Sequence, residues 1–204
     1  MTPIELAEKG WAPDWVIRQG IRRLLSERLK NEMDRDPEAR ARRTQSLMDE
    51  LASSDIAIET DAANEQHYEV PAAFYQLALG ARLKYSSAYY PPGVETLDQA
   101  EEAMLEATCE HAELVDGQRV LELGCGWGSL TLWMAGNYPN SQITAVSNSA
   151  SQREYIEQRA LDLGLDNLNV ITCDVNQLEL EHRFDRVVSV EMFEHVRNYR
   201  ELLK

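Results

Sequence analysis

The stretch RVLELGCGWG, residues 119–128, is a short apolar run that ends in three closely spaced glycines. Glycine lets the backbone turn tightly from a strand into a helix and lets a ligand approach the main chain. The glycines lack the GxGxxG spacing of the dinucleotide fingerprint, and the sequence contains no GxxxxGK[ST] phosphate loop. We therefore expect a nucleoside ligand with one charged tail, although glycine-rich turns also occur for structural reasons alone.

From Gln118 onward, short β-branched runs alternate with helix-length segments. The runs are RVLELG, QITAVS, NVITCD and FDRVVSVE, and the pattern predicts helices near 128–137 and 150–163 and another starting near Glu194. This alternation is typical of a parallel sheet with crossover helices, so we predict an α/β, Rossmann-like fold. The fourth run is apolar enough for a central strand yet would lie at an edge, so we expect a truncated chain with a partial sheet.

The N-terminal region is helical in pattern. Apolar residues recur every three or four positions over residues 15–29 with arginines between them, and Asp14 is the expected N-cap. A second helix is predicted from Pro37 to about Leu51. We interpret these basic helices as solvated faces packed on a neighbour; contact with a phospholipid or a target peptide is the alternative.

The segment between these two regions is mixed. Residues 53–63 are polar and predict a linker, and residues 71–80 predict a short helix with Pro71 in its first turn. Residues 83–97, LKYSSAYYPPGVETL, resemble a loop, after which a capping box at Thr96 opens a helix to about Leu114.

Charge excludes several classes of function. The chain has a formal net charge of −15, divided into 10 basic and 12 acidic residues over 1–60 and 10 basic and 23 acidic residues over 61–204. Such a balance disfavours a nucleic-acid partner and an anionic membrane surface. No apolar run approaches the roughly 20 residues that span a bilayer, and the start MTPIELAEKGW lacks the apolar region of a signal peptide.

Cysteine usage indicates a reduced, cytoplasmic protein. The three cysteines are Cys109, Cys125 and Cys173, an odd number without a CxxC pair. A disulfide framework and a zinc knuckle are therefore not expected. Cys125 lies inside the glycine loop, where a small side chain is needed, and no paired base marks it as a nucleophile.

Neutral polar side chains follow the second apolar run. Asn148, Ser149 and Gln152 offer amides and a hydroxyl that can hydrogen-bond to the hydroxyls of a ribose. Asn148 or Ser149 as a plain N-cap of the next helix is the alternative.

Ionisable side chains follow the third and fourth runs. Asp174 could accept the exocyclic amine of a purine with Val175 against the ring, or it could open a turn. Glu191, Glu194 and His195 would share one face if a helix begins there. A carboxylate beside an imidazole suits proton transfer, whereas acids also favour a plain helix N-terminus. A metal site would need further ligands, which the sequence does not offer.

Together these motifs resemble the class I S-adenosylmethionine-dependent methyltransferases of the cyclopropane fatty-acid synthase superfamily. LELGCGWG matches the glycine motif and LKYSSAYY the cofactor-covering Tyr-Ser loop, and SNSASQREYI, CDV and EMFEHVRNY follow in the family's order. Within the superfamily the chain is similar to the coclaurine-type N-methyltransferases in RRLLSERLK, QHYEVPAAFY, SNSASQ and EMFEH.

The resemblance implies S-adenosylmethionine as the cofactor and a fold in three regions. These are a helical cap over residues 1–60, a cofactor-covering loop with helices over 61–117, and a partial Rossmann-like domain over 118–204. The family continues beyond residue 204 with further strands and a substrate-covering region.

The resemblance also implies a role for each site residue. Glu191 and His195 would be the catalytic pair, with Glu194 beside them. Tyr85 and Ser86 would contact the methionine end of the cofactor, and Gly124 and Gly126 of the glycine loop would line it. Asn148 and Gln152 would contact the ribose, and Asp174 and Val175 the adenine. Val190 would flank the methyl-transfer face.

Three functions are compatible with these features. The first is methyl transfer to the nitrogen of a small-molecule amine, which the resemblance favours because Glu191 stands where the lipid-modifying branch has a small residue. The second is cyclopropane-fatty-acyl-phospholipid synthase-like modification of unsaturated lipids. The third is an inactive cofactor-binding fragment. The expected partner is the amine or the lipid, with a homodimer as a candidate assembly.

Overall fold

A computed structural model describes residues 2–33, 36–58 and 72–204 of the chain. The chain divides into two compact units, Met1–Ser53 and Ser54–Lys204. The three regions with boundaries at residues 60 and 117 stay a prediction.

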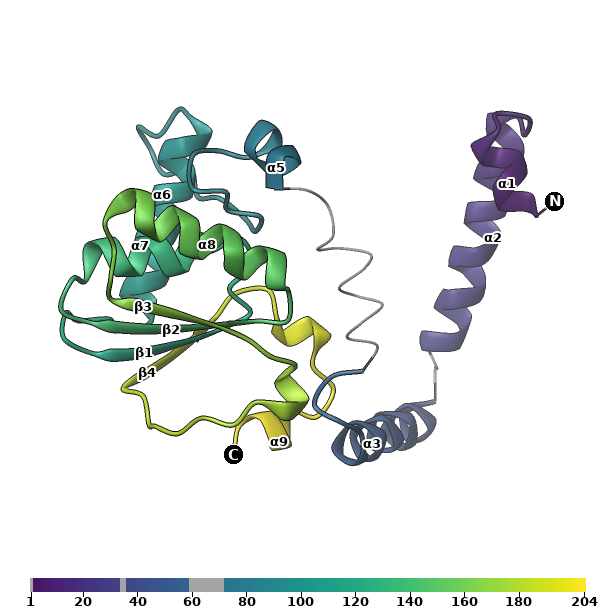
Figure 1. The fold of residues 1–204 in the computed structure, drawn as a ribbon. Coiled ribbons are helices and arrows are strands. Elements are labelled where there is room, and N and C mark those ends of the chain that lie inside the picture. Colours follow the sequence, from purple (N-terminus) through teal and green to yellow (C-terminus); the bar gives the residue numbers. More distant parts are fainter. Residues whose placement is uncertain (1, 34–35, 59–71) are drawn as a thin grey trace. The chain divides into compact units, whose positions relative to one another are not determined.

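The first unit consists of α1 (Pro3–Glu8), α2 (Asp14–Glu32) and α3 (Pro37–Ser53), drawn in purple and blue in Figure 1. The start predicted for α2 was wrong by one residue, because Pro13 takes the N-cap position and Asp14 lies in the first turn. Asp14 there still interacts favourably with the helix dipole. Apolar side chains of α2, among them Trp15 and Leu24, are exposed, so their packing on a neighbour stays a prediction.

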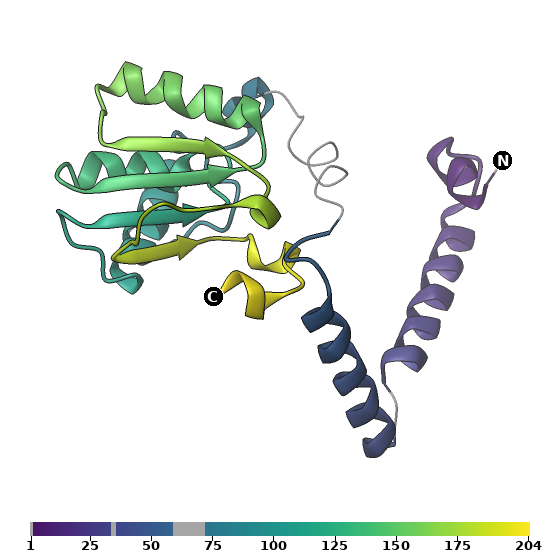
Figure 2. The same ribbon diagram turned by 60° about the horizontal axis from the view of Figure 1, so that its bottom comes forward.

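The second unit is built on a four-stranded parallel sheet, as predicted. Its order is β3-β2-β1-β4, and Figure 2 shows β4 at one edge. The strands are β1 (Arg119–Leu123), β2 (Gln142–Ser147), β3 (Leu168–Thr172) and β4 (Arg186–Ser189). The chain runs outward from β1 to β3 and then returns to the other side of β1. This reversal places the switch point beside the glycine loop, where parallel α/β sheets bind ligands.

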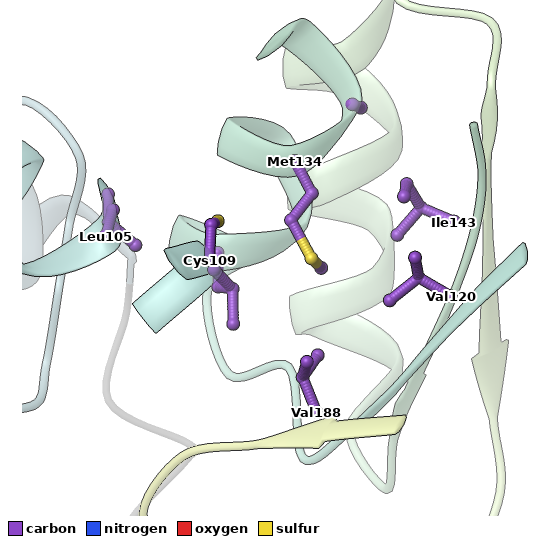
Figure 3. Packing of buried hydrophobic residues seen from close by; sticks show 8 residues of the cluster. Leu105, Cys109, Val120, Met134, Ile143 and Val188 are labelled. Atoms are coloured by element: carbon purple, nitrogen blue, oxygen red, sulfur yellow. The ribbon is translucent and has the colours of Figure 1, made fainter. Parts of the chain in front are cut away.

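Three helices cover one face of the sheet: α6 (Leu97–His111), α7 (Ser129–Asn137) and α8 (Ala150–Leu163). Figure 3 shows Met134 of α7 reaching toward Val120, Ile143 and Val188 on three strands. The predicted capping box of α6 is confirmed, because the Thr96 side chain accepts the N–H of Gln99 and the Gln99 side chain accepts the N–H of Thr96.

The opposite face of the sheet is covered by the chain that follows β3. Leu121, Leu123 and Val146 form a cluster against which Phe184 and Met192 pack. This segment contains η1 (Val175–Gln177), η2 (Phe193–His195) and α9 (Tyr199–Leu202).

The continuous helix predicted to start near Glu194 was wrong. Glu191 has a left-handed backbone with φ of 52°, and a single 3₁₀ turn follows it. The α-helix begins only at Tyr199, where the Asn198 side chain caps it by accepting the N–H of Glu201.

The segment that precedes the sheet domain is described in two pieces. Residues 54–58 lie against the C-terminal segment, with a bridge between Ala57 and Val196. The helix predicted over residues 71–80 is α5 (Ala72–Ala78), and Pro71 lies outside the described residues. None of the helices formed by the described residues combines the length and hydrophobicity that crossing a bilayer requires.

Candidate active site

A cavity of about 350 Å³ opens at the carboxyl ends of the strands. Ser149 does not line it, but every site residue that the family resemblance implies lies on its wall. These residues are Tyr85, Ser86, Gly124, Gly126, Asn148, Gln152, Asp174, Val175, Val190, Glu191, Glu194 and His195.

The glycine loop forms one side of the cavity. At Gly126, φ is 53°, and a Cβ added there would meet no atom within 4 Å. The main chain is thus uncovered at this point, and a ligand can lie directly against it. The loop is held in place by β2, because the N–H groups of Gly124 and Cys125 both donate to the carbonyl of Val146.

Gln152 carries an unpaired buried group. Its side chain is only 2% exposed, and its Oε1 accepts a hydrogen bond from Ser147 Oγ at 2.6 Å. Among the residues that the structure describes, its Nε2 has no hydrogen-bond partner, nor has the buried Ser129 Oγ in the same cavity. Buried donors are normally satisfied, so Nε2 indicates a ligand with an acceptor oxygen, as a ribose has. Ser149 has the structural role considered above, because it caps α8.

Asp174 opens a turn, which is one of the two roles considered from the sequence. Its Oδ1 accepts the N–H of Asn176 at 2.8 Å and so opens the η1 turn, while the residue lines the cavity beside Val175. Contact between its carboxylate and the exocyclic amine of a purine stays a prediction.

The loop that carries Tyr85 and Ser86 packs onto the glycine loop through aromatic rings. The Tyr75 ring lies 5.0 Å from that of Tyr85 and 5.4 Å from that of Trp127. Sequence reasoning missed Lys84, whose Nζ donates to Ser86 Oγ. Burial lowers the pKa of Lys84, although the Glu191 and Glu101 carboxylates favour its charged form.

Glu191, Glu194 and His195 all reach the cavity, but not from one helical face. The predicted spacing on a single face was wrong, since the left-handed Glu191 precedes the short η2 turn that holds Glu194 and His195. A sharp turn instead brings two carboxylates and an imidazole to one wall.

Glu122 is a further cavity residue that sequence reasoning did not assign to the site. It is 3% exposed, and Thr131 Oγ1 donates to its Oε2 at 2.5 Å. Burial raises the pKa of Glu122 to about 8, so the protonated form predominates at neutral pH. The available signal was an acid in the middle of the apolar run RVLEL.

A metal ion is not indicated by the part of the chain that the structure describes. Within it, no group of three or more His, Cys, Asp or Glu residues is arranged to hold a metal ion.

A family profile described as mycolic acid cyclopropane synthetase matches residues 57–203. The chain belongs to this family. The resemblance to S-adenosylmethionine-dependent methyltransferases is thereby confirmed, as is the fold class.

Two relatives of this cyclopropane synthetase family member are named for different substrates, an amine and a phospholipid. The (S)-coclaurine N-methyltransferase of Thalictrum flavum subsp. glaucum is 40% identical over 204 residues, covering 98% of this chain and 56% of the relative. The cyclopropane-fatty-acyl-phospholipid synthase of Escherichia coli (strain K12) is 36% identical over 137 residues, covering 66% of this chain and 34% of that one.

A solved structure extends the comparison to three dimensions. Coclaurine N-methyltransferase bound to N-methylheliamine and SAH superimposes with a TM-score of 0.84 at 41% identity, covering 98% of this chain and 57% of that one. The presence of SAH in that structure agrees with the predicted cofactor, S-adenosylmethionine. This family member spans little more than half the length of these N-methyltransferases.

Proposed function

We propose that this chain is the cofactor-binding part of an S-adenosylmethionine-dependent methyltransferase that acts on the nitrogen of a small-molecule amine. The observation that carries the proposal is that one cavity joins the uncovered glycine loop to the cluster of Glu191, Glu194 and His195. Similarity to an N-methyltransferase over 98% of the chain supports the amine as the acceptor.

The cavity suits a nucleoside cofactor at several points. Gly126 offers its main chain, Gln152 Nε2 offers an unused buried donor, and Asp174 offers an acceptor beside the apolar Val175. Tyr85 and Ser86 are assigned to the methionine end of the cofactor.

Bound S-adenosylmethionine supplies a methyl group that is already activated as a sulfonium. The residues of the chain then have to orient the acceptor, exclude water and manage one proton. An ammonium has no lone pair, so the amine must react in its neutral form. His195 takes the proton from the substrate, and the carboxylates of Glu191 and Glu194 attract the cationic amine to the cavity.

The lipid-modifying alternative has weaker support. The Escherichia coli cyclopropane-fatty-acyl-phospholipid synthase matches 66% of the chain, against 98% for the N-methyltransferase. Co-sedimentation with liposomes of unsaturated phospholipid separates the two functions. A chain that sediments only when the liposomes are present would favour the lipid substrate over the amine.

The proposal is tested first by calorimetric titration of the purified chain with S-adenosylmethionine and S-adenosylhomocysteine. Saturable one-to-one binding is expected, and a folded chain that binds neither would contradict the proposal.

The catalytic roles are tested in a version of the protein extended to the length of its relatives, with cyclic amines as acceptors. His195→Ala should lower kcat by about 10²-fold or more, as loss of a proton-transfer group does. Glu191→Ala should raise the KM for the amine, because its carboxylate attracts the cationic form of the substrate. Unchanged kinetic constants in both variants would refute the assigned roles. An extended protein that binds the cofactor but methylates no amine would favour an inactive cofactor-binding protein.

A further inference from the structure

The turn that leads into the Tyr-Ser loop is held in place by hydrogen bonds that its backbone N–H groups donate. Residues 80–84 contain five backbone N–H groups, and each has an acceptor. The N–H of Leu83 donates to the carbonyl of Gly80, which closes the turn. The other four donate to two carboxylates of α6: the N–H groups of Gly80, Arg82 and Lys84 to Glu101, and that of Ala81 to Asp98.

Glu101 accepts three of these bonds and is completely buried. Its Oε1 accepts the N–H of Gly80 at 3.0 Å and that of Lys84 at 3.3 Å, and its Oε2 accepts the N–H of Arg82 at 2.9 Å. A buried carboxylate requires such compensation, and the turn supplies it.

The fit between the turn and this carboxylate is close. A Cβ added to Gly80 would lie 2.7 Å from Glu101 Oε2 and 2.7 Å from Asp98 Oδ1. Leu83 adopts a left-handed backbone with φ of 49° and is buried against Tyr75 and Trp127. The turn is therefore fixed on one side by α6 and on the other by the glycine loop.

Lys84 ends this turn, and Tyr85 and Ser86 follow it directly. All three line the cavity, whereas Glu101 is not among the residues on the cavity wall. We propose that Glu101 is a positioning residue, which sets the loop that receives the methionine end of the cofactor without touching the cofactor. The inference rests on the proposed function, because it assigns that end of the cavity to the amino-acid tail of S-adenosylmethionine.

The substitution Glu101→Gln tests this role. An amide has one acceptor oxygen where the carboxylate has two, so its NH₂ group faces a loop N–H that no longer has an acceptor. The loop should rearrange locally. The first turn of α8, which holds Gln152, and the turn after β3, which holds Asp174, should keep their geometry.

The affinities for two ligands distinguish a role of Glu101 in positioning the loop from a general effect on the structure of the chain. S-adenosylhomocysteine has the amino-acid tail, whereas 5′-methylthioadenosine shares the adenosine and the sulfur but lacks that tail. Glu101→Gln should weaken S-adenosylhomocysteine binding about 10-fold and leave 5′-methylthioadenosine binding within about 2-fold of the parent chain. Glu102→Gln is the matched control, since Glu102 contacts only the Arg82 side chain of this turn, at 2.7 Å and 3.0 Å, and should change neither affinity.

Asp98→Ala provides a second test if Glu101→Gln does not fold, because it removes only the acceptor of the Ala81 N–H. It should weaken S-adenosylhomocysteine binding about 3-fold and spare 5′-methylthioadenosine. Equal losses for both ligands, or no loss for either, would overturn the positioning role while leaving the proposed function standing. A parent chain that binds neither ligand would overturn the proposed function and this inference with it.

Discussion

Asn176 binds the main chain of Ala57, 119 residues earlier in the sequence. Its Oδ1 accepts the N–H of Ala57 at 3.1 Å, and its Nδ2 donates to the carbonyl of Ala57 at 2.9 Å. Ala57 and Ile58 line the cavity, so this pair of hydrogen bonds fixes one of its walls. Because Asn176 follows Asp174 and Val175 directly, one turn connects the strand-end carboxylate with that wall.

Asn176→Ala should therefore weaken cofactor binding as well as stability. The loss of two partly buried hydrogen bonds should lower the free energy of unfolding by about 1–3 kcal/mol, and S-adenosylhomocysteine affinity should fall several-fold. Urea denaturation and calorimetry measure the two effects. Asn169→Ala, at an exposed position of β3, is the control. An Asn176→Ala chain with the parent's affinity would show that the wall at Ala57 does not depend on this contact.

Glu122 should make stability depend on pH. Because its pKa in the folded chain is about 8, above the ordinary value of 4.5, the folded state binds more protons than the unfolded state between these values. Its contribution to the free energy of unfolding is complete below pH 4.5 and is lost as pH rises through about 8, with a slope of at most about 1.4 kcal/mol per pH unit.

Glu122→Gln should remove this dependence, since glutamine keeps an acceptor for Thr131 and does not ionise. Urea denaturation at about pH 6 and about pH 9 should show the variant gaining stability relative to the parent at the higher pH. The exposed Glu106→Gln provides the baseline. Parallel pH profiles for the parent and Glu122→Gln would mean that Glu122 is ionised in the folded chain.

Gly128→Ala and Gly136→Ala should have opposite effects. Gly128 has φ of 78°, and an added Cβ would lie 2.5 Å from Ile156 Cγ1. Backbone strain and overpacking together should cost about 2–4 kcal/mol. Gly136 lies within α7 with no atom within 4 Å of an added Cβ, so alanine there should stabilise the chain by up to about 1 kcal/mol. Thermal melting measures both, and equal melting temperatures would contradict the described packing of α8 on the glycine loop.

The three cysteines should differ in reactivity toward iodoacetamide. Burial raises the pKa of Cys109 to about 11 and also raises the pKa of Cys125, so neither should form thiolate near neutral pH. Cys173 is only partly buried and lines the cavity. Peptide mass spectrometry should find Cys173 labelled first and protected by S-adenosylhomocysteine. Labelling of Cys125 at the same rate would be inconsistent with the burial of its side chain.

Much of the fold could be predicted because its signals are local. The four apolar runs and the capping box at Thr96 depend on neighbouring residues, and each appears in the structure where the sequence places it. The left-handed backbone of Glu191 had no such signal, since a non-glycine residue in that conformation is set by its surroundings. The helix predicted near Glu194 was wrong for that reason.

The sequence predicted more of the residues that line the cavity than of the residues that hold its walls in place. The segments that follow the strands of a parallel sheet meet at one edge. This is why Gln152, in the first turn of the helix after β2, and Asp174, just after β3, could be assigned to one cavity. Glu101 escaped notice because it reads as one of several acids on a solvated helix. Glu101 lies one helical turn before Leu105 and two turns before Cys109, and both of these residues are buried. Because residues at this spacing share one helix face, the spacing could have shown that Glu101 is buried as well.

The turn at residues 80–84 also has a consequence for sequence variation. A loop that is held through its peptide groups leaves the side chains at Ala81 and Arg82 open to replacement, provided that neither becomes proline. Gly80 and Glu101 have no such latitude, because one must lack a side chain and the other must supply both oxygens. A saturation-mutagenesis map of this region should therefore alternate between positions that tolerate substitution and positions that do not. The position that tolerates the fewest substitutions should be Glu101, which lies outside the turn on α6.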